Sequence, residues 1–263
     1  MRREHNAAAS GGGGGEDLFM YLPLNGDFID QVSGEDISPG FGSSTVTSWY
    51  ADPADSSRQC LRNVNDGSYK SFPYLFRKNI DGTYRYLLPA TTAAYPSTGS
   101  YYSLLGKTAE FWWYPQSSSG NKYILEDIDS LISTSTSGLY GYDLYRNGTT
   151  LYIYAKGRLN NANKNQQYTW GAFTNYKWYR ITLAYKDNGD STYTSTYKLY
   201  GSDGTLLLNS DTLGMPPVPY GDTNSLCTAD RVQLFFHSHY SYYGAGINAL
   251  DYLKEFKIYN DLL

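Results

Sequence analysis

Three acidic residues lie within four positions in the run Leu125-Glu-Asp-Ile-Asp-Ser130. Successive side chains of a β-strand point to opposite faces, so Asp127 and Asp129 would share one face and Glu126 would lie on the other. Two carboxylates on one face offer the oxygen ligands that calcium takes in proteins. We therefore name Asp127 and Asp129 as candidate metal ligands, with calcium as the only cofactor that the sequence suggests.

Histidine and cysteine are too few and too scattered to predict a nucleophile or a zinc site. His237 and His239 alternate along one segment, but tetrahedral zinc takes four ligands. Cys60 and Cys227 lie far apart in the sequence, and we predict free thiols, with one disulfide as the alternative. No Ser-His-Asp or Cys-His set is compelling, so we expect a protein that is not an enzyme.

Aromatic residues gather in three stretches that are also rich in small and polar residues, as loops are. Aromatic rings stack on the apolar faces of sugars, while polar groups bind the hydroxyls. Exposed aromatic residues also mark interfaces, so packing or subunit contact is the alternative for each stretch. The predicted ligand-binding residues are Tyr95 in stretch 95–102, Tyr168 and Trp170 in stretch 166–171, and Tyr240, Tyr242 and Tyr243 in stretch 239–244.

The elements that would position these residues are strands. The chain contains 29 Tyr residues, and Tyr favours the pleated surface of a sheet. Residues 179–185 alternate between apolar and polar side chains, and residues 140–155 predict a hairpin around Asn147-Gly148. The further turns predicted at Asx-Gly pairs are Asn25-Gly26, Asp66-Gly67, Asp81-Gly82, Asn188-Gly189 and Asp203-Gly204. Many short strands without helical periods predict an all-β sandwich.

Residues 1–16 differ in composition from the rest, because Gly11 to Gly15 follow a run of small residues. We predict a flexible N-terminal arm over residues 1–16 and one domain over 17–263. The net charge of −4 disfavours nucleic acid as a partner. No window reaches the roughly 20 apolar residues of a membrane span, and the N-terminus lacks the apolar run of a secretory signal.

The domain opens at 18–27 with a hydrophobic run that ends in a turn, has the segments 109–115 and 177–185 in its middle, and ends with the segment 253–263. In this order the segments resemble the first strand, the middle strands and the last strand of the laminin G-like, concanavalin A-like jelly-roll family. The chain departs from the family at two places: the pair of His residues that often follows the central Trp is Tyr179 and Arg180 here, and the usual Asp of the last strand is Lys254.

The resemblance implies a two-sheet antiparallel jelly-roll sandwich that frequently binds glycans or proteins, sometimes with calcium. Some members hydrolyse glycans, but the glucanase signature places a second Glu shortly after an Asp such as Asp127, where this chain has Ser130 and Leu131. Since that chemistry needs two carboxyl groups, the departure disfavours catalysis.

We therefore expect a non-catalytic carbohydrate-binding or adhesion module. The Gly-rich arm and the Tyr-rich and Ser-rich composition suggest a virion protein, such as a phage fibre or capsid-decorating subunit made in the host cytoplasm. Its expected partners are a surface glycan and other virion subunits, in a homo-oligomer. The alternatives are a purely structural virion subunit, a bacterial surface domain, and a glycoside hydrolase.

Overall fold

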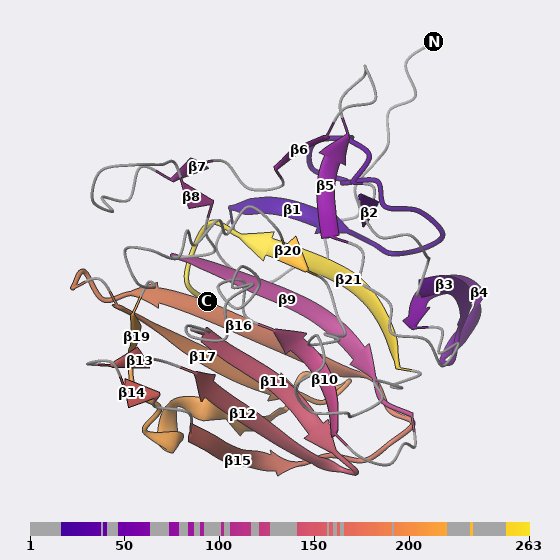
Figure 1. The fold of residues 1–263 in the computed structure, drawn as a ribbon. Coiled ribbons are helices and arrows are strands. Elements are labelled where there is room, and N and C mark those ends of the chain that lie inside the picture. Colours follow the sequence, from indigo (N-terminus) through magenta and orange to yellow (C-terminus); the bar gives the residue numbers. More distant parts are fainter. Residues whose placement is uncertain are drawn as a thin grey trace.

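The computed structural model describes a β-sandwich of antiparallel strands (Figure 1). The described residues are 17–37, 39–40, 47–63, 74–78, 84–86, 90–91, 101–102, 106–116, 121–126, 141–156, 158–159, 162–163, 166–190, 192–219, 232–233 and 251–263. Among them the one helical element is the 3-10 turn η2 (Ser210–Leu213), and no helix is long and apolar enough to span a bilayer. The predicted arm at residues 1–16 lies outside the described residues.

The larger sheet has nine strands within the described residues, and its main order is β18-β17-β16-β9-β21-β4-β3. β21 pairs with β9 along one edge, and along its other edge β4 pairs with its first residues and β1 with its last ones. The strands are β1 (Leu18–Leu22), β3 (Thr47–Asp52), β4 (Asp55–Asn63), β9 (Lys107–Tyr114), β16 (Tyr179–Asp187), β17 (Thr192–Tyr200), β18 (Leu206–Asn209), β19 (Val218–Pro219) and β21 (Tyr252–Tyr259).

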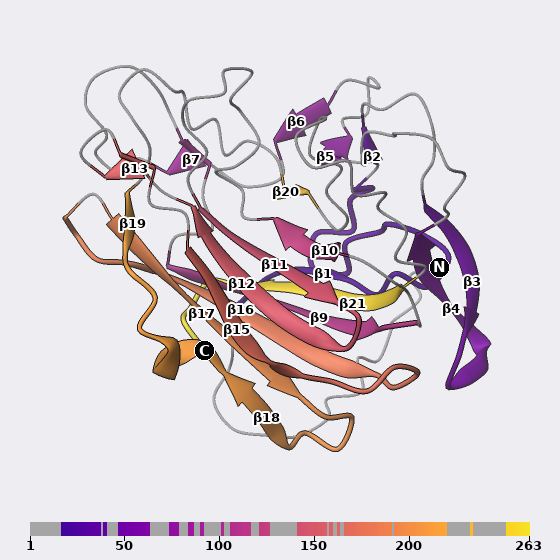
Figure 2. The same ribbon diagram turned by 60° about the horizontal axis from the view of Figure 1, so that its bottom comes forward.

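The smaller sheet has the order β10-β11-β12-β15 and lies face to face with the larger one (Figure 2). Its strands are β10 (Asn121–Glu126), β11 (Gly141–Asn147), β12 (Thr150–Lys156) and β15 (Gln166–Ala172). The remaining short strands are β2 (Pro39–Gly40), β5 (Tyr74–Lys78), β6 (Tyr84–Tyr86), β7 (Ala90–Thr91), β8 (Tyr101–Tyr102), β13 (Arg158–Leu159), β14 (Ala162–Asn163) and β20 (Val232–Gln233).

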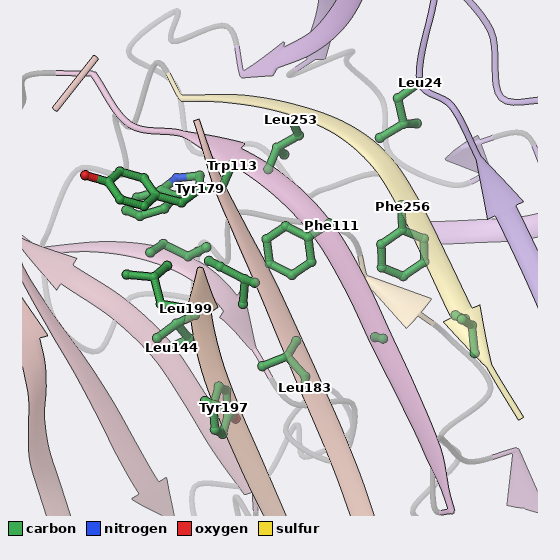
Figure 3. Packing of buried hydrophobic residues seen from close by; sticks show 14 of the residues in the cluster. Leu24, Phe111, Trp113, Leu144, Tyr179, Leu183, Tyr197, Leu199, Leu253 and Phe256 are labelled. Atoms are coloured by element: carbon green, nitrogen blue, oxygen red, sulfur yellow. The ribbon is translucent and has the colours of Figure 1, made fainter. Parts of the chain in front are cut away.

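The hydrophobic core lies between the two sheets (Figure 3). Alternate residues of β9 and β16 point into it, among them Phe111, Trp113 and Leu183, and all are fully buried. Leu144 of β11 and Ile153 of β12 meet them from the smaller sheet. The sheets pack closely near Gly171, where an added Cβ would lie 2.5 Å from a methyl carbon of Leu208.

The jelly-roll sandwich predicted from the sequence is confirmed, and so are its clearest elements. β11 and β12 form the predicted hairpin, and Gly148 between them has φ of +58°. β16 covers the predicted alternating segment, and β21 is the predicted closing strand. The turns at Gly26, Gly189 and Gly204 also have positive φ, while Asp66-Gly67 and Asp81-Gly82 lie outside the described residues.

Candidate functional site

The larger sheet carries a second set of aromatic residues on the face turned away from the core. Since strand side chains alternate, Trp113 of β9 enters the core while Trp112 and Tyr114 lie on the opposite face. There they pack against a small buried cluster of Cys60, Trp178 and Tyr252. We call this side of the larger sheet the outer face.

Four rings of the outer face contact one another in a chain that crosses several strands. The ring centres of Tyr50 and Tyr252 are 6.4 Å apart, those of Tyr252 and Tyr114 are 5.8 Å apart, and those of Tyr114 and Trp178 are 5.3 Å apart. Two of these contacts are edge-to-face, a geometry that aromatic quadrupoles favour. Tyr50, Tyr114, Trp178 and Tyr252 therefore form one connected aromatic cluster.

Tyr176 stands beside this cluster, in the loop that leads into β16. It has φ of +63°, a left-handed conformation that costs a bulky residue of the order of 1 kcal/mol. Its backbone N–H donates to the carbonyl of Pro115 at 2.8 Å, directly after Tyr114. Although the backbone is strained, 58% of Tyr176 is exposed. Core packing therefore gives no reason for an aromatic side chain at this position.

Cations and aromatic rings alternate in a row across four neighbouring strands of the outer face. Lys254 of β21 is the cross-strand partner of Trp112 of β9, which is the partner of Arg180 of β16. Arg180 is in turn the partner of Tyr200 of β17, and its guanidinium lies 4.3 Å from the centre of that ring. We call Lys254, Trp112, Arg180 and Tyr200 the outer row. Its side chains are all partly exposed.

Cations also cover rings of the aromatic cluster, next to the outer row. Lys254 Nζ lies 4.1 Å from the centre of the Trp178 ring. The Arg62 guanidinium lies 4.7 Å from the centre of the Tyr50 ring and 5.1 Å from the centre of the Tyr252 ring. Such cation–π contacts are each worth about 0.5–2 kcal/mol, depending on how far they are shielded from water. The rings therefore hold the cations in defined positions.

Asp52 lies beneath the outer row and binds its residue Lys254. Its carboxylate accepts from Lys254 Nζ at 2.6 Å, from the Ala54 N–H at 2.8 Å and from Trp178 Nε1 at 3.0 Å. Burial by itself raises the pKa of Asp52, but these hydrogen bonds and the charge of Lys254 outweigh it, so the pKa is lowered. Asp52 therefore stays ionised and fixes Lys254.

Glu110 is the second buried carboxylate of the outer face. It lies 3.2 Å from Arg180 and 3.4 Å from Lys257, and it accepts a hydrogen bond from the Tyr259 hydroxyl at 3.3 Å. One carboxylate therefore positions two cations.

Cys60 lies beneath the aromatic cluster and is fully buried. Burial, and secondly the negative charge of Asp52, raises the pKa of its thiol to about 12. The thiol is free, as predicted, while Cys227 lies outside the described residues. Cys60 therefore serves as an apolar packing residue under the site.

The structure corrects the sequence prediction for Trp170 and Tyr168. Both lie in strand β15, and the predicted loop over 166–171 is wrong. Trp170 turns into the core, where its ring packs edge-to-face on Tyr197 and only 6% of the residue is exposed. Tyr168 is partly buried against the same core. Both rings therefore pack on the core between the sheets, and the face of Trp170 is closed to a sugar ring.

The other predicted site residues lie outside the described residues. These are the ligand-binding candidates Tyr95, Tyr240, Tyr242 and Tyr243 and the calcium candidates Asp127 and Asp129. Glu126 ends β10, where its Cα is paired with that of Asp143 on β11. Within the described ranges no group of three or more His, Cys, Asp and Glu could hold a metal ion. The candidate site on the outer face therefore rests on none of the residues predicted from the sequence.

One sequence feature could have drawn attention to the outer face. Arg180 and Lys254 are two of the positions at which the chain departs from the pattern of the family that it resembles. Although 74 residues separate them in the sequence numbering, the sheet places both beside Trp112. Only the position of both residues beside Trp112 shows that these two departures belong to one surface.

No protein-family model and no curated protein matches this chain. Among solved structures it is similar to the marine PL-14 alginate lyase from Aplysia kurodai, with 13% identity, a TM-score of 0.50, and coverage of 92% of this chain and 98% of that one. It is also similar to the binding domain of botulinum neurotoxin serotype G, with 13% identity and a TM-score of 0.48 over 94% of this chain and 48% of that one. The chain thus spans about half the length of that structure.

A third similar structure is a carbohydrate esterase from the Shiga toxin-encoding bacteriophage phi24B, with 12% identity, a TM-score of 0.40, and coverage of 94% of this chain and all of that one. At such low identities a likeness shows fold and not activity. The alginate lyase supports the jelly-roll sandwich, and the narrower laminin G-like, concanavalin A-like assignment stays a prediction.

Proposed function

We propose that this protein is a non-catalytic carbohydrate-binding module and that the outer face of its larger sheet is the binding surface. The observation that carries the proposal is Tyr176, an aromatic residue that is 58% exposed in a strained backbone conformation beside the aromatic cluster. Strained residues concentrate at functional sites, and an exposed ring can stack on the apolar face of a sugar. The 37% exposure of Tyr50 extends this aromatic surface at the far end of the cluster.

Hydrogen-bonding groups next to the rings match the hydroxyl groups of a sugar. Arg180 and Lys254 flank Trp112, and the side chains of all three are partly exposed. Sites for small polar ligands combine aromatic walls with a few charged or polar groups in this way. The proposed glycan binding is therefore supported by the chemistry of this surface. It does not depend on the activities of the proteins with a similar fold.

The test uses Tyr176→Gly, because glycine relieves the left-handed backbone while it removes the ring. We expect the free energy of unfolding of this variant to equal that of the wild type or to exceed it by up to about 1 kcal/mol. We also expect the variant to bind immobilised polysaccharides at least fivefold more weakly than the wild type does. Binding would be measured on a panel of bacterial and plant polysaccharides by affinity electrophoresis. Unchanged binding by the folded variant would remove the outer face as the site.

A matched pair of variants distinguishes binding on the larger sheet from binding on the smaller sheet. Tyr200→Ala changes the outer row, while Tyr152→Ala removes a similarly half-buried ring that stacks on Tyr145 in the smaller sheet. We expect weaker binding only for Tyr200→Ala. Loss of binding on Tyr242→Ala alone would instead place the site in the aromatic stretch at 239–244 that the sequence suggested.

The absence of catalysis is part of the proposal and has its own test. Each polysaccharide that binds would be incubated with the protein and analysed for new reducing or unsaturated chain ends. We expect none above a control without protein. If new chain ends appeared with the wild type but not with the Tyr176→Gly variant, the outer face would be an active site.

A virion role, as a fibre or capsid-decorating subunit in a homo-oligomer, is the finer part of the proposal. Its support is the composition: 29 Tyr and 26 Gly residues with a Gly-rich segment at 11–15. The test is to probe purified phage particles with an antibody raised against the domain. Labelled particles are expected, and unlabelled particles from a lysate that contains the protein would refute the role.

A further inference from the structure

The charges of the outer face do not balance, and the excess is positive. Four cations contact its aromatic rings, namely Arg62, Arg180, Lys254 and Lys257. Three of them, Arg180, Lys254 and Lys257, share two carboxylates, Asp52 and Glu110, which gives 3 − 2 = +1 for these five groups. The whole chain carries −4, so the sign of this cluster is opposite to that of the protein.

The cations also lie closer to the solvent than the carboxylates do. The exposed fractions of the side chains are 32% for Arg180, 24% for Lys257 and 14% for Lys254. Those of Glu110 and Asp52 are 6% and 1%. A ligand approaching the outer face therefore meets the positive groups first, while the carboxylates beneath hold them in place.

Two of these cations stand on either side of Trp112 at a defined spacing. Lys254 and Arg180 belong to β21 and β16, which are separated by β9 alone. At about 4.8 Å between strands, their backbones are roughly 10 Å apart. That span is comparable to two sugar rings of an extended polysaccharide. A guanidinium also matches the planar carboxylate, to which it can donate two hydrogen bonds.

From this geometry we propose that the outer row binds a polysaccharide whose sugar units carry carboxylate groups. In this arrangement Trp112 stacks on one ring, while Lys254 and Arg180 bind the carboxylates of the rings on either side. The aromatic contacts of both cations lower the entropy lost on binding, because their side chains are already positioned. The inference rests on the proposed glycan binding and adds the chemical class of the glycan.

The experiment compares polygalacturonate with the neutral galactan made from the same preparation by carboxyl reduction. Isothermal titration would be used with the wild-type chain and with Arg180→Gln and Lys254→Gln. The control is Lys186→Gln, which removes the same charge from an exposed position on β16, six residues or about 20 Å from Arg180. Thermal unfolding of each variant verifies that it is folded.

We expect binding to polygalacturonate, at least tenfold weaker binding to the reduced polymer, and about tenfold weaker binding for Arg180→Gln but not for Lys186→Gln. Arg180→Gln is the decisive variant, because Glu110 keeps Lys257 as a partner. Equal binding of both polymers would overturn the choice of an acidic glycan and leave glycan binding in place. Equal losses for Arg180→Gln and Lys186→Gln would overturn the outer row as the site. No binding to these or to any other polysaccharide would overturn the proposed function as well.

Discussion

Two groups of charged residues in this protein use the same side-chain chemistry at different depths. Arg146 and Asp251 form an ion pair of 2.7 Å in which both side chains are fully buried. Asp52 and Glu110 on the outer face also hold cations, but those cations reach the solvent. The first group joins strands of the two sheets, since Arg146 lies in β11 and Asp251 directly precedes β21.

The buried pair is saturated by its surroundings. Asp251 accepts from Arg146, from Trp113 Nε1 at 2.9 Å and from the Gln116 N–H at 2.9 Å. Arg146 also donates to the carbonyls of Gln116 and Gly148. All of these hydrogen-bond partners belong to the protein itself, so this buried group stabilises the fold and does not bind a ligand.

The outer cations Arg180, Lys254 and Lys257 share two carboxylates, and their side chains reach the solvent. The pKa values follow this difference. Burial raises the pKa of Asp251 against the opposing charge of Arg146, whereas hydrogen bonds lower that of Asp52 in spite of its burial. The depth of an ion pair, and not its length, therefore distinguishes the buried pair from the outer pairs, whose cations reach the solvent.

The largest effect is expected from breaking the buried pair. Arg146→Met leaves Asp251 in the interior without its cation, which should lower the free energy of unfolding by about 3–5 kcal/mol. Denaturant titration followed by tryptophan fluorescence measures this loss. The double variant Arg146→Met/Asp251→Leu should recover most of it, because two apolar groups remove the unpaired charge. A loss below about 1 kcal/mol for the single variant would contradict the structural role.

A smaller effect is expected from the corresponding change on the outer face. Lys254→Met removes one partner of Asp52, which keeps its hydrogen bonds to Ala54 and Trp178. The free energy of unfolding should fall by about 1–3 kcal/mol in the same titration. If Lys254→Met proved as destabilising as Arg146→Met, the distinction between the two groups would fail.

Acid should weaken the outer anchor. The folded-state pKa of Asp52 lies below the ordinary carboxyl value of 3.8, so its stabilising contribution is present above about pH 4 and is lost as the pH falls through the lowered pKa. Asp52→Asn should therefore show a smaller decrease in stability between pH 5 and about pH 2 than the wild type does. Parallel curves for the two proteins would argue against this ion pair.

The smallest change is expected from thiol reagents at Cys60. With a pKa of about 12 and a fully buried side chain, Cys60 should remain unmodified at pH 8 while the protein is folded. The assay would use a Cys227→Ser background, so that Cys60 alone can react, with the unfolded protein as the positive control. Rapid modification of the folded protein would show that the aromatic cluster does not close over the thiol.

Sequence reasoning recovered the elements with strong local patterns. Alternation over 179–185 and the Asn147-Gly148 turn depend on neighbours in the chain, and both are present as β16 and the β11–β12 hairpin. It failed at Trp170, because the polar residues around it suggest a loop while pairing with β12 makes the segment a strand. A single residue does not reveal which face of the sandwich its side chain will join.

The sequence alone therefore determined the class of fold, because strand periodicity and turn chemistry are local properties. It also marked Arg180 and Lys254 as unusual, through the family that the chain resembles. Only the tertiary structure made these two residues neighbours of Trp112 and separated Trp112 from Trp113 as outer and inner residues. The physical reason is that cross-strand register joins residues distant in sequence, and burial then decides which of them fill the core and which remain available to a ligand.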